Sequence, residues 1–143
     1  MEAIAILQPV FVVALLTVVI TFRMYITRVS TMKKLRIHPQ KAQDTSHLKA
    51  LLPDEVNRVA NNYNHLFEQP TLFYVVCLAI ALLGHVDSFF VICAWLYAGL
   101  RIAHSIVQVT VDFVLARFSL FVLSWLVLAA MIIKESLAVF TLI

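Results

Sequence analysis

The sequence predicts an all-α integral membrane protein: one domain over residues 1–143, folded as a bundle of four transmembrane helices. The first reason is composition, because 62% of the residues are hydrophobic and 13% are charged, against about 25% charged in soluble domains. The second is that the hydrophobic residues form stretches long enough to cross a bilayer. The third is the low content of Gly (2) and Pro (4), which favours long helices over a β-barrel.

The first helix is expected over about residues 3–27. Its hydrophobic part, Ala3–Phe22, contains no charged residue, and Arg23 and Arg28 follow it. A signal peptide carries its positive charge before the hydrophobic stretch, whereas Glu2 stands there in this chain. We therefore expect a retained transmembrane helix.

A basic segment over about residues 28–53 follows, and we expect it to be a cytoplasmic loop. Between Arg28 and Arg58 the chain holds 7 of its 11 Lys and Arg residues. The positive-inside rule accounts for such a segment. No aromatic or groove-reading pattern accompanies the charge, so we expect no nucleic-acid partner.

Three further helices are expected over about residues 54–83, 86–109 and 112–140. Acidic residues in the sequence Pro53-Asp54-Glu55 are typical of a helix start. Pro70 should kink this helix, because proline removes a backbone donor. The connection over 84–88 contains no Lys or Arg, as is typical of the outer side. With the basic loop inside, both termini lie outside the cytoplasm.

Polar residues inside the predicted helices are the candidates for function. Two sets each share one helical face: Arg58, Asn61, His65 and Glu68 in the second helix, flanked by Asn62, Asn64 and Gln69, and Arg101, His104, Ser105 and Gln108 in the third. Arg117 begins the fourth helix. All three groups lie toward the cytoplasmic side in this topology, so they can converge.

Charged groups at membrane depth are costly and mostly face the protein interior. Glu68 and Arg101 are therefore expected to pair. A purely structural ion pair is one interpretation, but the excess of donors over carboxylates favours an anionic ligand that carries carboxylates or phosphate. Cys77 and Cys93 fall inside predicted helices, and we expect neither a disulfide nor a metal site.

Two segments resemble the signatures of the MAPEG family (membrane-associated proteins in eicosanoid and glutathione metabolism). Asn61–Tyr74 resembles the signature of the family's second helix, and Trp95–Ser105 its Arg-x-x-His signature in the third helix. Arg117 stands where the family has an arginine entering the fourth helix. The resemblance covers essentially the whole chain and is closest to the bacterial branch.

The resemblance implies a homotrimer in a bacterial inner membrane, surrounded by lipids, that binds glutathione as a co-substrate between neighbouring protomers. Enzymes of the family are transferases or peroxidases that act on small lipophilic substrates. In this picture Arg117 is the catalytic residue and stabilises the glutathione thiolate. The implied ligand-binding residues are Arg28, Asn61, Asn64, His65, Glu68, Arg101, His104 and Gln108, and Arg23 is the less favoured match for the same helix-one arginine as Arg28.

The sequence departs from the family pattern at several of these positions. His65 replaces an asparagine, Asn61 and Asn64 replace arginines, and Gln108 replaces a tyrosine. Losing two arginines weakens the positive field that a thiolate and two carboxylates require. Whether the chain is an enzyme therefore stays open. A non-catalytic protein binding another anionic ligand or a lipid headgroup is one alternative, and a small proton-coupled transporter using Glu68 is another.

Overall fold

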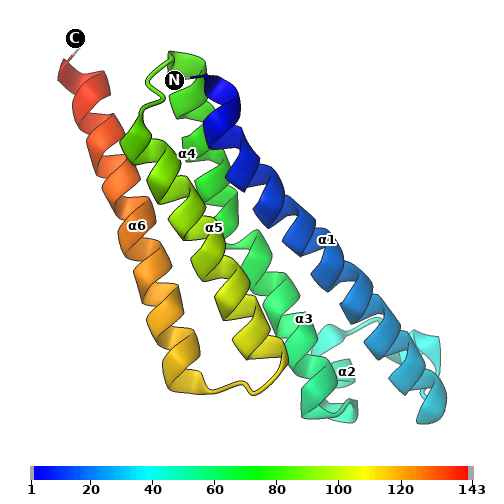
Figure 1. The fold of residues 1–143 in the computed structure, drawn as a ribbon. Coiled ribbons are helices and arrows are strands. Elements are labelled where there is room, and N and C mark those ends of the chain that lie inside the picture. The colour runs from blue at the N-terminus through cyan, green and yellow to red at the C-terminus, as the bar shows by residue number, and fades with distance from the viewer. Residues whose placement is uncertain (1, 142–143) are drawn as a thin grey trace.

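A computed structural model describes residues 2–141 as a bundle of long helices with both chain ends at the same end (Figure 1). The elements are α1 (Ala3–Lys34), the 3-10 helix η1 (Pro39–Ala42), α2 (Thr45–Leu51), α3 (Asp54–Phe67), α4 (Gln69–Leu83), α5 (Ser88–Val109) and α6 (Val114–Thr141). Counting α3 and α4 as one broken rod, four helices are long and apolar enough to cross a membrane. The predicted all-α membrane bundle is confirmed.

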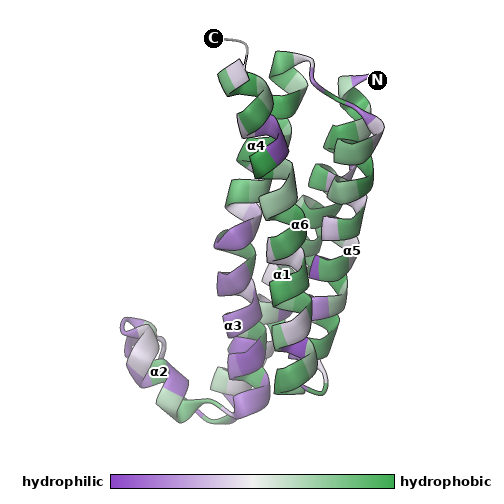
Figure 2. Cartoon of the chain, turned by 90° about the vertical axis from the view of Figure 1, so that its left-hand side faces the viewer, coloured by the Kyte–Doolittle hydropathy of each residue, from purple (hydrophilic) through white to green (hydrophobic). Residues whose placement is uncertain are grey.

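The outer surface of the bundle is apolar. In the most hydrophobic window of each span, between 17% and 39% of the residues are buried, so most of the apolar side chains face outward. Figure 2 shows hydrophobic residues over much of the bundle, while hydrophilic residues concentrate along α3 and in α2. A soluble monomer rarely exposes so much continuous apolar surface. The surface is therefore suited to lipid.

The basic segment is more ordered than a simple loop. α1 continues past its predicted end near residue 27 to Lys34, and the predicted loop over 28–53 contains η1 and α2. A small second core explains this order, because Leu48, Leu52 and Val56 are buried together against Met32 and Ile37. The apolar residues of this segment thus dock α2 onto the ends of α1 and α3.

The kink predicted at Pro70 is confirmed, and it is a full break between α3 and α4. The backbone leaves the helical region at Glu68, with φ −86° and ψ −97°, and Pro70 lies in the first turn of α4. Proline has no N–H for the carbonyl of Leu66 four residues earlier. The break changes which side chains face inward: Gln69 is buried and Glu68 is exposed.

The main apolar core occupies the half of the bundle that contains α4. Its centre is the stacked pair of Phe73 and Tyr97, whose ring centroids lie 4.1 Å apart. Ile6 of α1 and Leu128 of α6 are fully buried in the same cluster. The buried polar side chains of α3 and α5 therefore lie in the opposite half, toward α2.

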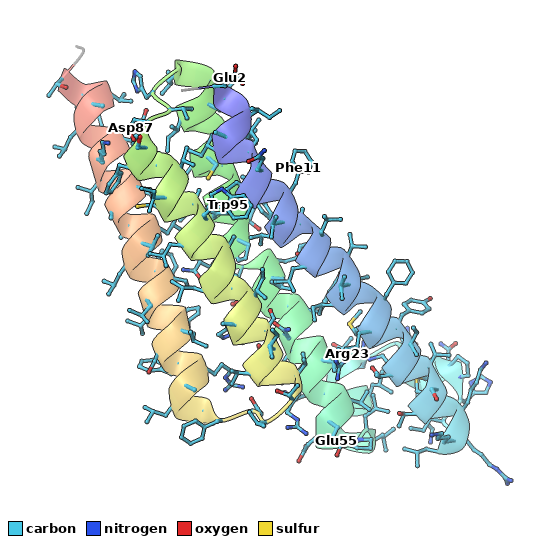
Figure 3. All side chains as sticks on the ribbon, in the orientation of Figure 1. Glu2, Phe11, Arg23, Glu55, Asp87 and Trp95 are labelled. Atoms are coloured by element: carbon cyan, nitrogen blue, oxygen red, sulfur yellow. The ribbon has the colours of Figure 1, made fainter. Side chains whose placement is uncertain are left out.

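The connection between α4 and α5 is held by its own backbone and by α6. Gly84 ends α4 with φ +73°, a left-handed conformation that glycine adopts without strain. Asp87, labelled in Figure 3, accepts a hydrogen bond from the Phe90 backbone N–H at 3.0 Å and pairs with Lys134 of α6. Hydrogen bonding from Lys134 lowers the pKa of the Asp87 carboxyl. Nδ1 of His85 lies 2.8 Å from Oε1 of Glu135.

Asn57 is expected to hold α2 in place. Its side-chain amide donates to the carbonyls of Lys49 and Leu52, at 2.9 and 3.0 Å, at the end of α2. Asn57→Ala should therefore lower the free energy of unfolding by about 1–2 kcal/mol, because two carbonyls lose their donor. Hydrogen exchange should also become faster in residues 45–53. Thermal unfolding in detergent and exchange mass spectrometry measure both effects.

Asn64→Ala is the matched control, because Asn64 lies on the same helix, is exposed, and its side chain makes no hydrogen bond within residues 2–141. Equal exchange rates over residues 45–53 in the two variants would show that Asn57 does not anchor α2.

Candidate functional site

The polar face of α5 is turned to the protein interior. Arg101, His104, Ser105 and Gln108 are each exposed by 2% or less. They follow one another at the spacing of a single helical face, so their burial means that this whole face packs against neighbouring helices. Buried polar groups need hydrogen-bond partners, and the partners of Arg101 and Ser105 come from α3 and from the α3–α4 break.

Arg101 connects α5 to the break between α3 and α4. Its guanidinium donates to Oε1 of Gln69 at 3.1 Å and to the backbone carbonyl of His65 at 3.0 Å. Oε1 of Gln69 lies 3.0 Å from the hydroxyl of Ser124 on α6, which donates to it. One amide oxygen thus joins three membrane-spanning helices around a buried cation.

The expected ion pair between Glu68 and Arg101 is absent among residues 2–141, so that expectation was wrong. The Glu68 side chain is 60% exposed, and its carboxylate lies 3.0 Å from Nδ1 of His65. The break at Glu68 is the physical reason, because it turns this side chain outward and brings the neighbouring Gln69 into the position facing Arg101.

A second buried contact joins α3 and α5 one turn nearer to α2. The hydroxyl of Ser105 donates to Oδ1 of Asn62 at 3.1 Å, and both residues are buried. Sequence reasoning placed Asn62 and Gln69 beside the predicted face rather than on it, and it did not single out Ser124. The signal for Ser124 was available, since it lies seven residues after Arg117 and so shares its face of the helix.

A pocket of about 180 Å³ opens beside these contacts, between the end of α3, α5 and the start of α6. Its polar lining comes from His65, His104 and Arg117, and its apolar lining from Val114, Phe118 and Phe121. His104 is 2% exposed, and its Nδ1 has no hydrogen-bond partner within the described chain. The pocket surface is thus mainly apolar, and the Arg117 guanidinium and two histidine rings contribute to its lining.

Arg117 has a partner of its own at the rim of this pocket. Its guanidinium lies 2.5 Å from the carboxylate of Asp112, and both side chains are partly exposed. Asp112 stands in the connection between α5 and α6 with φ +50°. The pair holds Arg117 in position and partly offsets its charge.

Three of the predicted ligand-binding residues lie in a separate pocket. Arg28, Asn61 and Asn64 line a pocket of about 190 Å³ between α1, α2 and α3, which shares no lining residue with the first. Nε of Arg28 is buried and has no hydrogen-bond partner in residues 2–141. The fold of a single chain therefore brings His65, His104 and Arg117 together, while Arg28, Asn61 and Asn64 lie in the separate pocket.

Two of the predicted ligand-binding residues are buried inside the bundle. Arg101 is fully buried and engaged by protein groups, and Gln108 is buried with its Oε1 unpartnered in the described chain. Cys77 is buried and Cys93 partly buried, and both are free thiols. The described residues contain no group of three or more His, Cys, Asp or Glu side chains placed to hold a metal ion.

Comparison with protein-family models agrees with this architecture. The chain matches the model of the MAPEG family over residues 6–135, a range that begins in α1 and reaches into α6. Searches of curated proteins and of solved structures gave no match. Because the matched range covers nearly the whole chain and all four membrane-spanning helices, this multi-pass protein belongs to the MAPEG family.

Proposed function

We propose that the chain is a membrane-embedded, glutathione-dependent transferase or peroxidase acting on small lipophilic electrophiles. The observation that carries the proposal is the mixed lining of the pocket at His65, His104 and Arg117. Glutathione needs donors for its carboxylates and a cation for its thiolate, while a lipophilic substrate needs apolar surface. Phe118 is 62% exposed on the outer face of α6, so a substrate dissolved in lipid can reach the pocket from the side.

Arg117 is the proposed catalytic residue. A guanidinium next to a thiol lowers the thiol pKa and stabilises the thiolate, which is the reactive form. The thiolate attacks an electrophilic carbon, and the bond to the leaving group breaks as the carbon–sulfur bond forms. With a hydroperoxide the sulfur attacks oxygen and the O–O bond breaks; a second glutathione then yields the disulfide, the alcohol and water.

The remaining residues of this pocket bind and position the ligand in the proposal. Nδ1 of His65, near the end of α3, lies 3.0 Å from Oε2 of Glu68, at the α3–α4 break, and this pair can engage the amino and carboxylate end of glutathione. His104 forms part of the pocket wall. Arg101 acts through Gln69 and the His65 carbonyl, which it holds in place.

We further propose a homotrimer in which neighbouring copies share each site. The support is the separation of the Arg28, Asn61 and Asn64 pocket from the Arg117 pocket within one protomer, together with family membership. A ligand bound between two copies can contact the Arg28 pocket of one copy and the Arg117 pocket of its neighbour. The sites then face the cytoplasm of a bacterial cell, with the basic segment inside and both termini outside.

A non-catalytic binding protein is the second candidate, and the ion pair of Arg117 favours it. A guanidinium already held by Asp112 offers less charge to a thiolate. Asn61 and Asn64, where the family carries arginines, reduce the positive charge further. Such a protein would use the same pocket to bind another anionic ligand or a lipid headgroup.

Removing the charge of Arg117 tests the proposed function. Arg117→Ala should weaken glutathione binding by roughly 10- to 100-fold, because a charged hydrogen bond is lost, and should abolish the ultraviolet absorbance of bound thiolate at neutral pH. Calorimetric titration and difference absorbance of the purified protein measure these effects. Lys41→Ala is the control, since it removes a charge that does not line this pocket. Lack of glutathione binding by the wild-type protein at millimolar ligand would refute the proposal.

Releasing Arg117 from its partner should have the opposite effect. Asp112→Asn keeps a residue type that tolerates the left-handed backbone at this position, and it removes the competing carboxylate. Glutathione should bind roughly fivefold more tightly, which corresponds to the loss of a partly exposed ion pair. Weaker binding in Asp112→Asn would mean that the ion pair positions Arg117 rather than competes for it.

Mixed oligomers test whether neighbouring copies share the site. Arg28→Ala and Arg117→Ala should each bind glutathione poorly. Coexpressed at equal levels and purified without selecting for mixed trimers, they should regain about a quarter of the wild-type sites, because random mixing places both intact arginines at that fraction of interfaces. Calorimetric stoichiometry gives the number of sites. No recovery would place both arginines in a site within one copy.

A further inference from the structure

A polar groove of about 430 Å³ lies between α1 and α3, apart from both pockets described above. Its charged lining consists of three cations, Arg23, Lys34 and Arg58, and one carboxylate, Glu55. Thr110, at the end of α5, closes one side. Figure 3 labels Arg23 on α1 and Glu55 near the start of α3. The groove is therefore net positive and opens at the end of the bundle where α2 lies.

The three cations of this groove form no ion pair with a carboxylate among the described residues. None of them forms a salt bridge within residues 2–141, where the four ion pairs involve other residues. The guanidinium of Arg58 is fixed by one hydrogen bond to the carbonyl of Thr110, at 3.0 Å, and its Nε is buried without a partner. A fixed guanidinium with unused N–H groups is a typical donor for phosphate oxygens.

The position of the groove along α1 matches the edge of a membrane. Arg23 is the first charged residue after the uncharged stretch Ala3–Phe22, which has the length of a bilayer crossing. Arg23 therefore marks the level at which lipid headgroups begin. Basic pockets between transmembrane helices on the cytoplasmic side are typical sites for anionic headgroups.

An exposed apolar stripe leads from the groove up the outside of α1. Ile26 lines the groove and is 67% exposed, and Phe22, Val19 and Leu15 continue from it along one face, each more than 60% exposed. Spacings of four, three and four residues keep side chains on the same side of a helix. The stripe gives an acyl chain a surface directly above the cationic groove.

We propose that the α1–α3 groove binds the phosphate of an anionic phospholipid, with the acyl chains lying along the Leu15–Ile26 stripe. Arg23 and Arg58 bind the phosphate, and Lys34 adds positive charge at the open end. A soluble phosphate has the same headgroup chemistry, but it gains nothing from the stripe. Binding should therefore require both negative charge and an acyl chain.

Native mass spectrometry of the purified protein in detergent tests this proposal, with phosphatidylglycerol and phosphatidylcholine as probes. We expect one phosphatidylglycerol per chain to bind in preference to phosphatidylcholine. The double variant Arg23→Gln/Arg58→Gln should bind it roughly 30-fold more weakly, since each cation at an anionic surface contributes about a factor of five. Lys33→Gln/Lys41→Gln removes the same charge outside the groove and should bind like the wild type.

The variant Glu55→Gln distinguishes loss of the site from misfolding. Removing its carboxylate from the groove should tighten phosphatidylglycerol binding by about fivefold. A damaged protein would not gain affinity. Equal binding by the groove variant and its control, or equal binding of the two lipids, would overturn the proposal. Displacement of the lipid by an equal concentration of glycerol phosphate would also overturn it, because the groove would then be a site for soluble phosphate.

Discussion

The buried guanidinium of Arg101 is the interaction on which the polar half of the bundle depends. A charge inside a membrane protein is tolerated where hydrogen bonds to the protein compensate it. Arg101 finds two acceptors at the α3–α4 break, the His65 carbonyl and the Gln69 side chain. The backbone leaves the helical conformation at Glu68, and this break makes both acceptors accessible to the guanidinium. The break and the cation therefore stabilise each other, and Ser124 ties α6 to the same oxygen.

The two halves of the bundle differ in the side chains that they bury. The half around Phe73 and Tyr97 is packed with apolar side chains and holds the helices together. The other half holds the buried polar contacts, and the pocket at His104 and Arg117 opens beside them. Arg101 is fully buried, is hydrogen-bonded to Gln69 and to the His65 carbonyl, and does not line this pocket. The residues left to meet a ligand are those at the rim.

Family membership and local chemistry support different parts of the functional picture. The match over residues 6–135 shows the family and agrees with the architecture. The proposed glutathione chemistry rests on Arg117, whose charge is shared with Asp112. The α1–α3 groove is a separate site: its cations form no salt bridge among residues 2–141, and its Arg23 directly follows the uncharged stretch Ala3–Phe22. The basic residues of the chain thus form two separate proposed sites, the Arg117 pocket for a soluble anion and the α1–α3 groove for a lipid.

The sequence by itself determined the four membrane-spanning helices, the kink at Pro70 and the inward polar face of α5, because hydrophobic length, helical periodicity and the missing proline N–H are local properties. Only the tertiary structure decided which polar groups meet. The break at Glu68 rotates α4 relative to α3, so Gln69 rather than Glu68 faces Arg101. Packing of α6 supplies Ser124, and the separate pocket at Arg28 follows from the docking of α2. These pairings depend on helix rotation and packing, which spacing within a single helix does not specify.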